Sequence, residues 1–234
     1  MGHKIRQYYL PLLRYHLRII FGGKFIYFVV ASVGLFLLTS LLSLFGEGAF
    51  PNNADVYGFL LFPGLLLIFY PSAFGIQNEL DAKTLELSFG VPDYRYRIWL
   101  ARLLLLLATI YFTLILLGLL SWLIYYPPPL FEMAFQLMFP IAFVGTLAFY
   151  LSTLIRSGSG TAAVVAIAGF AIFLLGETIG GRWNIFLNPF SQNQDMSLAL
   201  WVETVYYNRI ILGVGTALFT LGGLLNLQRR EKFM

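Results

Sequence analysis

The chain alternates long apolar runs with short polar segments. An α-helix needs about 20 mainly apolar residues to cross a hydrocarbon core of roughly 30 Å. Six runs reach or approach that length: residues 25–45, 56–76, 98–125, 131–155, 161–175 and 205–225. Unbroken runs of this kind indicate helices, whereas a membrane β-barrel would show short alternating segments. The pattern therefore predicts an all-α integral membrane fold, with six transmembrane helices in a single domain.

Composition supports the same class. Of the 234 residues, 59% are hydrophobic and 11% are charged, and the mean hydropathy is +0.79. Soluble domains are about 45–50% apolar and about 25% charged, so a water-soluble domain is excluded. The chain contains no cysteine, which rules out disulfides and thiolate metal sites. A net charge of +4 is no footprint for nucleic acid, and its distribution is a topology signal instead.

The basic residues are distributed unequally between the two sides of the predicted membrane. If the N-terminus is cytoplasmic, thirteen lysines and arginines lie inside and two, Arg182 and Arg209, lie outside. Cytoplasmic loops carry such an excess, so both termini are predicted to be cytoplasmic. Two basic ends on one side require an even number of crossings, which agrees with six.

Residues 1–24 precede the first span and are basic. Arg14 and Arg18 are four positions apart and share a helical face, with leucines and Ile20 mostly opposite. This arrangement predicts an amphipathic helix lying at the cytoplasmic interface; a simple basic anchor is the alternative. The following apolar run extends to Phe45 without an A-x-A-like site, so it is interpreted as a retained span and not as a signal peptide.

The predicted outer loops are short, with one exception. Residues 176–204 contain Gly180–Gly181 and Asn188–Pro189, and a short helix is predicted near 195–203. The sequence thus predicts a short outer helical or re-entrant segment between the fifth and sixth spans.

A polar loop, residues 77–97, separates the second and third spans on the predicted cytoplasmic side. Asn78 is a suitable N-cap, and Glu79 and Asp81 would occupy the first helical turn, where the helix dipole favours anions. Gly90 and Pro92 would end the helix. The loop is therefore predicted to form a short capped helix whose apolar face could dock on a partner.

This loop resembles the conserved cytoplasmic segment of type 2 ABC exporter membrane subunits. The matching residues are Glu79, Thr84–Leu85–Glu86–Leu87, Pro92, Arg95 and Ile98. Lys83 stands where that family usually has glycine, and Asp93–Tyr94 replaces its Val-Ser pair. The sharp match covers about twenty residues, and the rest of the resemblance lies in the six-span arrangement with basic ends.

The resemblance implies a coupling helix that rests on a separate nucleotide-binding subunit, which would bind ATP and Mg. The implied coupling residues are Glu79, Leu80, Asp81, Lys83, Thr84, Leu85, Glu86, Leu87, Pro92 and Arg95. It also implies a prokaryotic cytoplasmic membrane, a homodimer or heterodimer of permeases, and a substrate path between the second and fifth spans. The alternative is a loop helix kept acidic only for solubility.

The chain lacks motifs for chemistry of its own. Lys24 follows Gly22–Gly23 without the other glycine of a Walker A loop, so no phosphate cradle is predicted. His3 and His16 have no partner ligands, and neither a G-x-S-x-G nor an H-E-x-x-H sequence occurs. We therefore expect no enzyme activity, resident cofactor or metal in this chain.

Within the spans, a few residues are candidates for a pathway or gate. Pro63 and Pro71 should bend the second span, and Thr109 and Thr113 share a face of the third. Such threonines more often bond back to their own helix. Gly215 and Gly222 offer small surfaces for close helix packing. Arg102, Glu132 and Glu177 are interpreted as boundary residues that reach toward water.

Two functions fit these features. The first is an exporter permease subunit for a lipid-like, drug-like, peptide or glycan substrate. The second is a membrane anchor that transmits ATPase-driven force to a partner without moving a solute; the coupling segment would serve both. A channel or membrane enzyme has no supporting motif.

Overall fold

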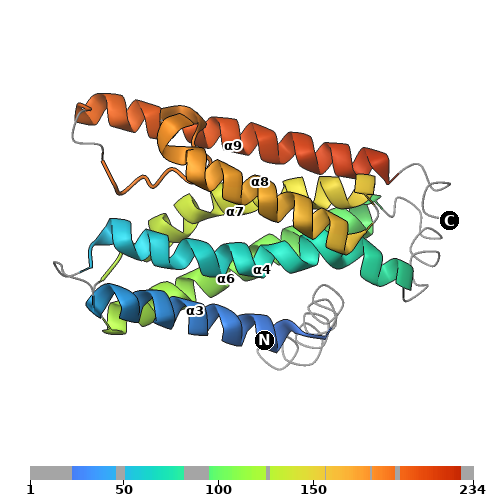
Figure 1. Ribbon diagram of the computed structural model, residues 1–234, viewed down its shortest axis with the longest axis horizontal. Helices are drawn as coiled ribbons and strands as arrows, with labels where there is room; N and C mark the ends of the chain where they lie inside the picture. Colours follow the sequence, from blue (N-terminus) through green and yellow to red (C-terminus); the bar gives the residue numbers. More distant parts are fainter. Residues whose placement is uncertain are drawn as a thin grey trace, which may run out of the picture.

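The computed structural model describes residues 23–45, 51–81, 95–124, 127–155, 157–179, 181–192 and 196–227. Its elements are α3 (Phe25–Phe45), α4 (Asn53–Asp81), the π-helix η2 (Arg95–Leu100), α6 (Ala101–Ile124), α7 (Leu130–Ile155), α8 (Gly158–Ile179), the 3-10 helix η3 (Gly181–Trp183) and α9 (Leu198–Asn226). In this part of the chain the fold is entirely helical, as predicted (Figure 1).

Six of these helices, all except η2 and η3, are long and apolar enough to cross a membrane. The prediction of six candidate spans is confirmed, and the chain is treated as a membrane protein. Helices suit this role because they pair most backbone polar groups within the segment, which is the requirement that hydrocarbon imposes on any spanning segment.

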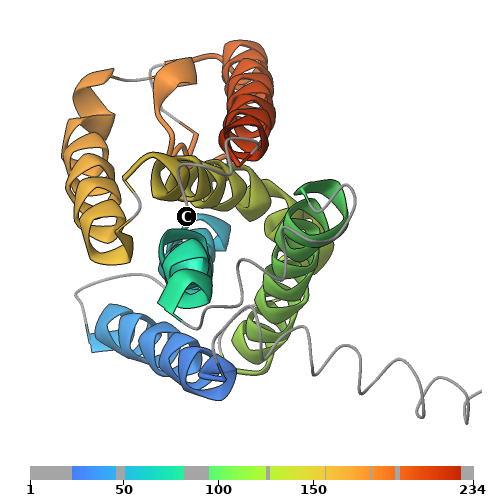
Figure 2. The same ribbon diagram turned by 90° about the vertical axis from the view of Figure 1, so that its right-hand side faces the viewer.

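Helices α4 and α7 form the centre of the bundle. Viewed along the bundle, α4 lies in the middle with α3, α6, α7 and α8 around it, and α9 lies on the far side of α7 (Figure 2). Helices α4 and α7 approach closely because glycines of each face isoleucines of the other. A Cβ on Gly64 would collide with Ile141, and one on Gly145 would collide with Ile68.

The packing of α9 on α7 also depends on glycines. A side chain on Gly215 would meet Phe143, and one on Gly222 would meet Tyr150. The prediction that these two glycines allow close helix packing is confirmed.

The outer helices of the bundle are much less covered. In α4 and α7, 56% and 50% of the most apolar stretch is buried, against 17% in α3 and in α8. Their exposed faces are apolar, with Val30, Leu38, Ile167 and Phe170 each more than half exposed. Such faces suit lipid or another membrane-embedded chain.

Two helices extend past their predicted ends. The second span was expected to end at residue 76 and a new helix to begin at Asn78, but α4 is continuous from Asn53 to Asp81. The predicted N-cap at Asn78 is therefore wrong. Residues 72–81 contain no proline after Pro71 and several good helix formers, so the helix continues where the hydropathy falls.

The short helix expected near 195–203 is likewise not separate in the described residues. Helix α9 begins at Leu198, where the Ser197 side chain caps it by accepting from Leu200 N, and continues as the sixth span. The predicted interfacial helix and most of the predicted coupling segment (82–94) lie outside the described residues.

Candidate functional site

Polar side chains of the helices gather near the two ends of the bundle. The Glu79 end, right in Figure 1, comprises residues 76–81 of α4 and 98–102 of η2 and α6, with the facing ends of α7, α8 and α9. The Arg209 end comprises Tyr57 of α4, Gln136 of α7, Arg209 of α9 and segment 181–192. An apolar groove lies between them.

An ion pair joins α4 to α6 at the Glu79 end. Arg102 Nη1 contacts Glu79 Oε1, and the Arg102 guanidinium also lies 5.3 Å from the centre of the Trp99 ring. Glu79 is only 8% exposed. Both partners are mostly desolvated, so the pair fixes the end of α4 against the start of α6.

Apolar packing extends this attachment to other helices. Trp99, Ile76, Phe149, Leu224 and Leu227 form a buried cluster that joins α4, η2, α7 and the end of α9.

Two hydrogen bonds complete the Glu79 end. Gly158 N at the start of α8 donates to the Gln77 side chain, and Asn226 Nδ2 donates to Thr153 Oγ1 at 3.1 Å. The parts of the chain that precede and follow segment 82–94, residues 76–79 of α4 and 99–102 of η2 and α6, thus contact each other and the ends of α7, α8 and α9.

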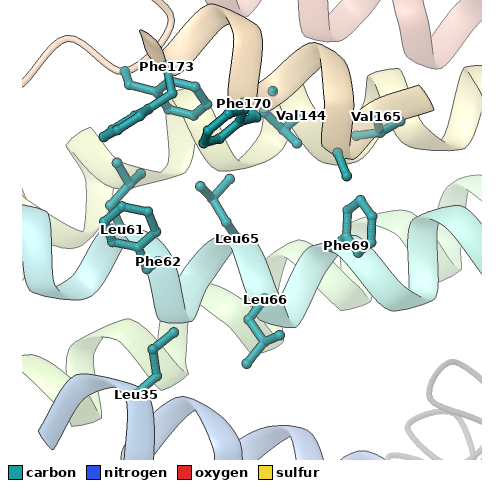
Figure 3. Close-up of a pocket in the computed structure, with 13 residues that line it drawn as sticks. Leu35, Leu61, Phe62, Leu65, Leu66, Phe69, Val144, Val165, Phe170 and Phe173 are labelled. Atoms are coloured by element: carbon teal, nitrogen blue, oxygen red, sulfur yellow. The ribbon is translucent and has the colours of Figure 1, made fainter. Parts of the chain in front are cut away.

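The groove opens between α3, α4 and α8 and has a volume of about 470 Å³ (Figure 3). It is lined by Leu35, Leu61, Phe62, Leu65, Leu66, Phe69, Val144, Val165, Ala166, Gly169, Phe170, Phe173 and Phe186. Every lining residue is apolar, so a bound molecule would find no hydrogen-bond partner among these side chains.

Three aromatic rings stand at one end of the groove. The rings of Phe62 and Phe173 are 6.1 Å apart, and Phe173 is 6.1 Å from Phe186, in edge-to-face arrangements. Phe186 belongs to segment 181–192, so that segment borders the groove toward the Arg209 end.

Arg209 is the centre of a hydrogen-bond network at its end. Its Nε donates to Gln136 Oε1 at 2.7 Å and its Nη1 to Asn208 Oδ1 at 2.8 Å. Its Nη2 approaches the Leu187 carbonyl at 3.2 Å and the Tyr57 hydroxyl at 3.5 Å. One side chain therefore joins α4, α7, α9 and segment 181–192.

Further bonds hold the same segment. Asn208 Nδ2 donates to the carbonyls of Arg182 and Asn184 at 3.0 and 2.9 Å. Asn188 Nδ2 donates to Ala54 O at 2.8 Å, and Trp201 Nε1 donates to Pro189 O at 3.2 Å. Segment 181–192 is fixed across the ends of α4 and α9 although it has little regular structure.

The predicted site residues are placed as follows. Glu79, Leu80 and Asp81 form the last turn of α4, whereas Arg14, Arg18, Lys83, Thr84, Leu85, Glu86, Leu87 and Pro92 lie outside the described residues. The backbone of Arg95 begins η2. Glu79 pairs with Arg102 inside the chain, so its carboxylate joins α4 to α6 beside segment 82–94.

The candidate gating residues lie within helices and do not line the groove; Pro63, Pro71 and Thr113 are buried, and Thr109 is half-buried. Pro63 and Pro71 lie inside α4, which continues through both; the expected bend stays a prediction. Thr109 Oγ1 donates to Leu105 O and Thr113 Oγ1 to Thr109 O, each at 2.8 Å. Both hydroxyls are therefore used within α6.

Sequence reasoning missed the roles of Arg209 and Arg102. Both lie inside predicted spans, and a charged residue within a span is by default a functional or paired site. That signal was present, but the partners Tyr57, Gln136 and Glu79 come from other helices, so no spacing along the chain could reveal them.

Searches with protein-family models, among curated proteins and among solved structures found no match to this chain. Within the described residues, no group of three or more His, Cys, Asp or Glu side chains could hold a metal ion. The function is therefore inferred from the residues and their geometry.

Proposed function

We propose that this chain is the membrane-spanning permease subunit of an ATP-driven exporter, with ATP and Mg bound by a separate nucleotide-binding subunit. Two copies, or one copy and a homologous permease, would enclose the pathway. The Glu79 end would face the cytoplasm, as the charge distribution predicts, and residues 1–24 would lie at that interface.

The observation that carries the proposal is the anchoring of segment 82–94, which bears the resemblance to exporter coupling helices. Its N-terminal side is fixed by Glu79 and its C-terminal side by Trp99 and Arg102. A displacement of this segment by an ATPase would be passed directly to α4 and α6, because these contacts are buried. The close contact of α4 with α7, in which glycines of each helix face isoleucines of the other, would transmit this displacement along the bundle.

The groove supports transport over pure force transmission. It lies between α4 and α8, the second and fifth spans, where the resemblance implies a substrate path. A membrane anchor that only transmits force has no need of such a space. The apolar lining favours a substrate part without hydrogen-bonding groups, because burying such groups unpaired is costly.

The first experiment tests coupling. The chain would be co-purified with a Walker A ATPase encoded beside it, as the wild type and as Glu86→Arg. We expect the reversal to abolish co-purification, whereas Glu203→Arg, an exposed site on α9 near the Arg209 end, should have no effect. An unaffected complex with Glu86→Arg would contradict the docking assignment.

The second experiment tests the path. Gly169 lines the groove and has nothing within 4 Å of an added Cβ, so Gly169→Leu should fill the space and stop ATP-dependent transport in vesicles. Gly213→Leu is the matched control, since Gly213 lies on α9, is exposed and also has open space around it. Equal transport by both variants would contradict a path through the groove.

A further inference from the structure

Arg209 is a buried cation that pairs with no carboxylate of the described residues. It is 7% exposed, and the only ion pair among the described residues joins Arg102 to Glu79. All four hydrogen-bond acceptors of Arg209 are neutral: two amides, a main-chain carbonyl and a phenol. A charged side chain inside a membrane domain usually marks an ion or substrate pathway.

The two edges of the guanidinium differ. Nε and Nη1 make short bonds of 2.7 and 2.8 Å to Gln136 and Asn208, which hold the side chain in place. Nη2 makes longer bonds of 3.2 and 3.5 Å to the Leu187 carbonyl and the Tyr57 hydroxyl. The bonds from Arg209 to neutral oxygens are already charge-assisted, and an anionic acceptor adds the attraction between opposite charges to the same hydrogen bond. An anion would therefore compete best at Nη2.

The Nη2 edge is linked to the groove through one peptide unit. Leu187, whose carbonyl it holds, directly follows Phe186, which lines the groove and packs on Phe173. The Tyr57 hydroxyl donates to the same carbonyl at 3.4 Å. Release of the Leu187 carbonyl from both side chains would loosen Phe186, which borders the groove toward the Arg209 end.

We propose that Nη2 of Arg209 recognises the anionic group, a phosphate or carboxylate, of an amphiphile whose acyl chain occupies the groove. The anion displaces the Leu187 carbonyl and the Tyr57 hydroxyl, and segment 181–192 then opens the end of the groove at Phe186. The proposal deepens the proposed function, on which it rests for the use of the groove as a path, by naming the substrate class.

The apolar part of this substrate class follows from the lining. The groove offers thirteen apolar residues and no polar side chain, which excludes the hydroxyl groups of a glycan and the amides of a peptide at this position. An acyl chain can pack against the apolar lining, and the anionic group can pair with the Arg209 guanidinium.

Because the chain has no cysteine, single cysteines can report opening. Leu187→Cys keeps the main-chain carbonyl that Arg209 holds, and the side chain at this position is buried. The full chain, reconstituted in lipid nanodiscs, would be labelled with a membrane-impermeant maleimide. Two probes with the same alkyl chain, dodecyl phosphate and dodecyl maltoside, would be added at equal concentration.

We expect dodecyl phosphate to raise the labelling rate of Cys at position 187 about tenfold, within the range usual for coupled sites, and dodecyl maltoside to have little effect. With Arg209→Gln in addition, the basal rate should rise and dodecyl phosphate should add nothing. Glu203→Cys, at an exposed charged position of α9, and Leu137→Cys, at a position of α7 that is 0% exposed, give the fast and slow limits that show the bundle is folded.

Tyr57→Phe is a milder variant that keeps Arg209, removes one neutral acceptor from Nη2 and removes the hydroxyl that donates to the Leu187 carbonyl. It should lower the concentration of dodecyl phosphate needed for half of the effect.

Equal action of the two probes, or an unchanged phosphate response with Arg209→Gln, would overturn the anion site. The labelling rate and its response to dodecyl phosphate do not depend on ATP. If the labelling experiment fails while Gly169→Leu still blocks ATP-dependent transport, only the anion site is contradicted, and the proposed function is not. A retained response in a chain that binds no ATPase would instead contradict the proposed function.

Discussion

The two ends of the bundle hold their helices together with an arginine each, but the partners differ. At the Glu79 end, Arg102 pairs with a carboxylate and lies over the Trp99 ring. At the Arg209 end, the guanidinium is held by neutral oxygens from several elements. Among the residues that the structure describes, the first arginine is paired with a carboxylate and the second is not.

The two ends therefore differ in how easily their contacts can be exchanged. The ion pair of Arg102 is a fixed contact, whereas the neutral acceptors of Arg209 are exchangeable. A desolvated ion pair is hard to break, because separating the partners leaves a buried charge uncompensated. A neutral oxygen that accepts from a cation can be replaced by an anion, because the ion pair offsets the loss of that hydrogen bond. The Glu79 end is therefore suited to receive force from segment 82–94, and the Arg209 end is suited to open.

The largest expected effect comes from breaking the ion pair. Arg102→Met leaves the Glu79 carboxylate buried, and we expect it to lower the free energy of unfolding by about 3–5 kcal/mol. The measurement is reversible unfolding of the chain in bicelles. The double variant Glu79→Leu/Arg102→Met removes both charges and should recover most of the loss; a double variant as unstable as the single one would show that the pair does not act as a unit.

Arg209→Met should cost less, about 2–3 kcal/mol, because it leaves only neutral groups such as the Gln136 and Asn208 oxygens without their donor. The same unfolding assay, run beside Arg102→Met, ranks the two ends directly. If Arg209→Met proved the more damaging of the two, the distinction between a fixed and an exchangeable end would fail.

The centre of the bundle decides whether the two ends act together. Gly145→Ala places a Cβ against Ile68, and we expect a loss of about 1–2 kcal/mol from this overpacking of α4 on α7. Gly34→Ala on α3, where nothing lies within 4 Å, is the matched control and should be neutral or slightly stabilising. In an ATPase complex, Gly145→Ala should also weaken the link between ATP turnover and labelling at position 187, which Gly34→Ala should leave intact.

A feature of this structure could be predicted from the sequence when the residues that determine it lie close together along the chain. The six spans follow from runs of about twenty residues, and Gly215 and Gly222 follow from spacing on one helix face. The end of α4 was misjudged because hydropathy falls at residue 77 while helix propensity does not. Hydropathy reports the solvent that a residue prefers, and not where its helix stops.

The sites were less accessible to sequence reasoning. Glu79 and Arg102 are 23 positions apart, and Tyr57 and Arg209 are 152 apart, so only the packing of helices brings them together. The groove is a space between three helices, and each of its lining residues, for example Phe62 or Gly169, looks like an ordinary residue of a span. No local pattern encodes such a space.

The smallest expected effects separate stability from function most clearly. Thr153→Val at the Glu79 end removes the acceptor of Asn226, and Trp201→Phe at the Arg209 end removes the donor to Pro189 O. Each should cost only about 0.6 kcal/mol, the average for side-chain hydrogen bonds between membrane helices.

The two substitutions should nevertheless differ in their effect on segment 181–192. Trp201→Phe releases one of the bonds that fix segment 181–192, so we expect faster labelling of a cysteine at position 187 and a larger response to dodecyl phosphate. Thr153→Val loosens a joint that already has an ion pair and an apolar cluster beside it, so labelling should stay at the wild-type rate. Equal labelling of the two variants would mean that segment 181–192 is held as firmly as the Glu79 end, and the exchangeable character of the Arg209 network would then be lost as an explanation for opening.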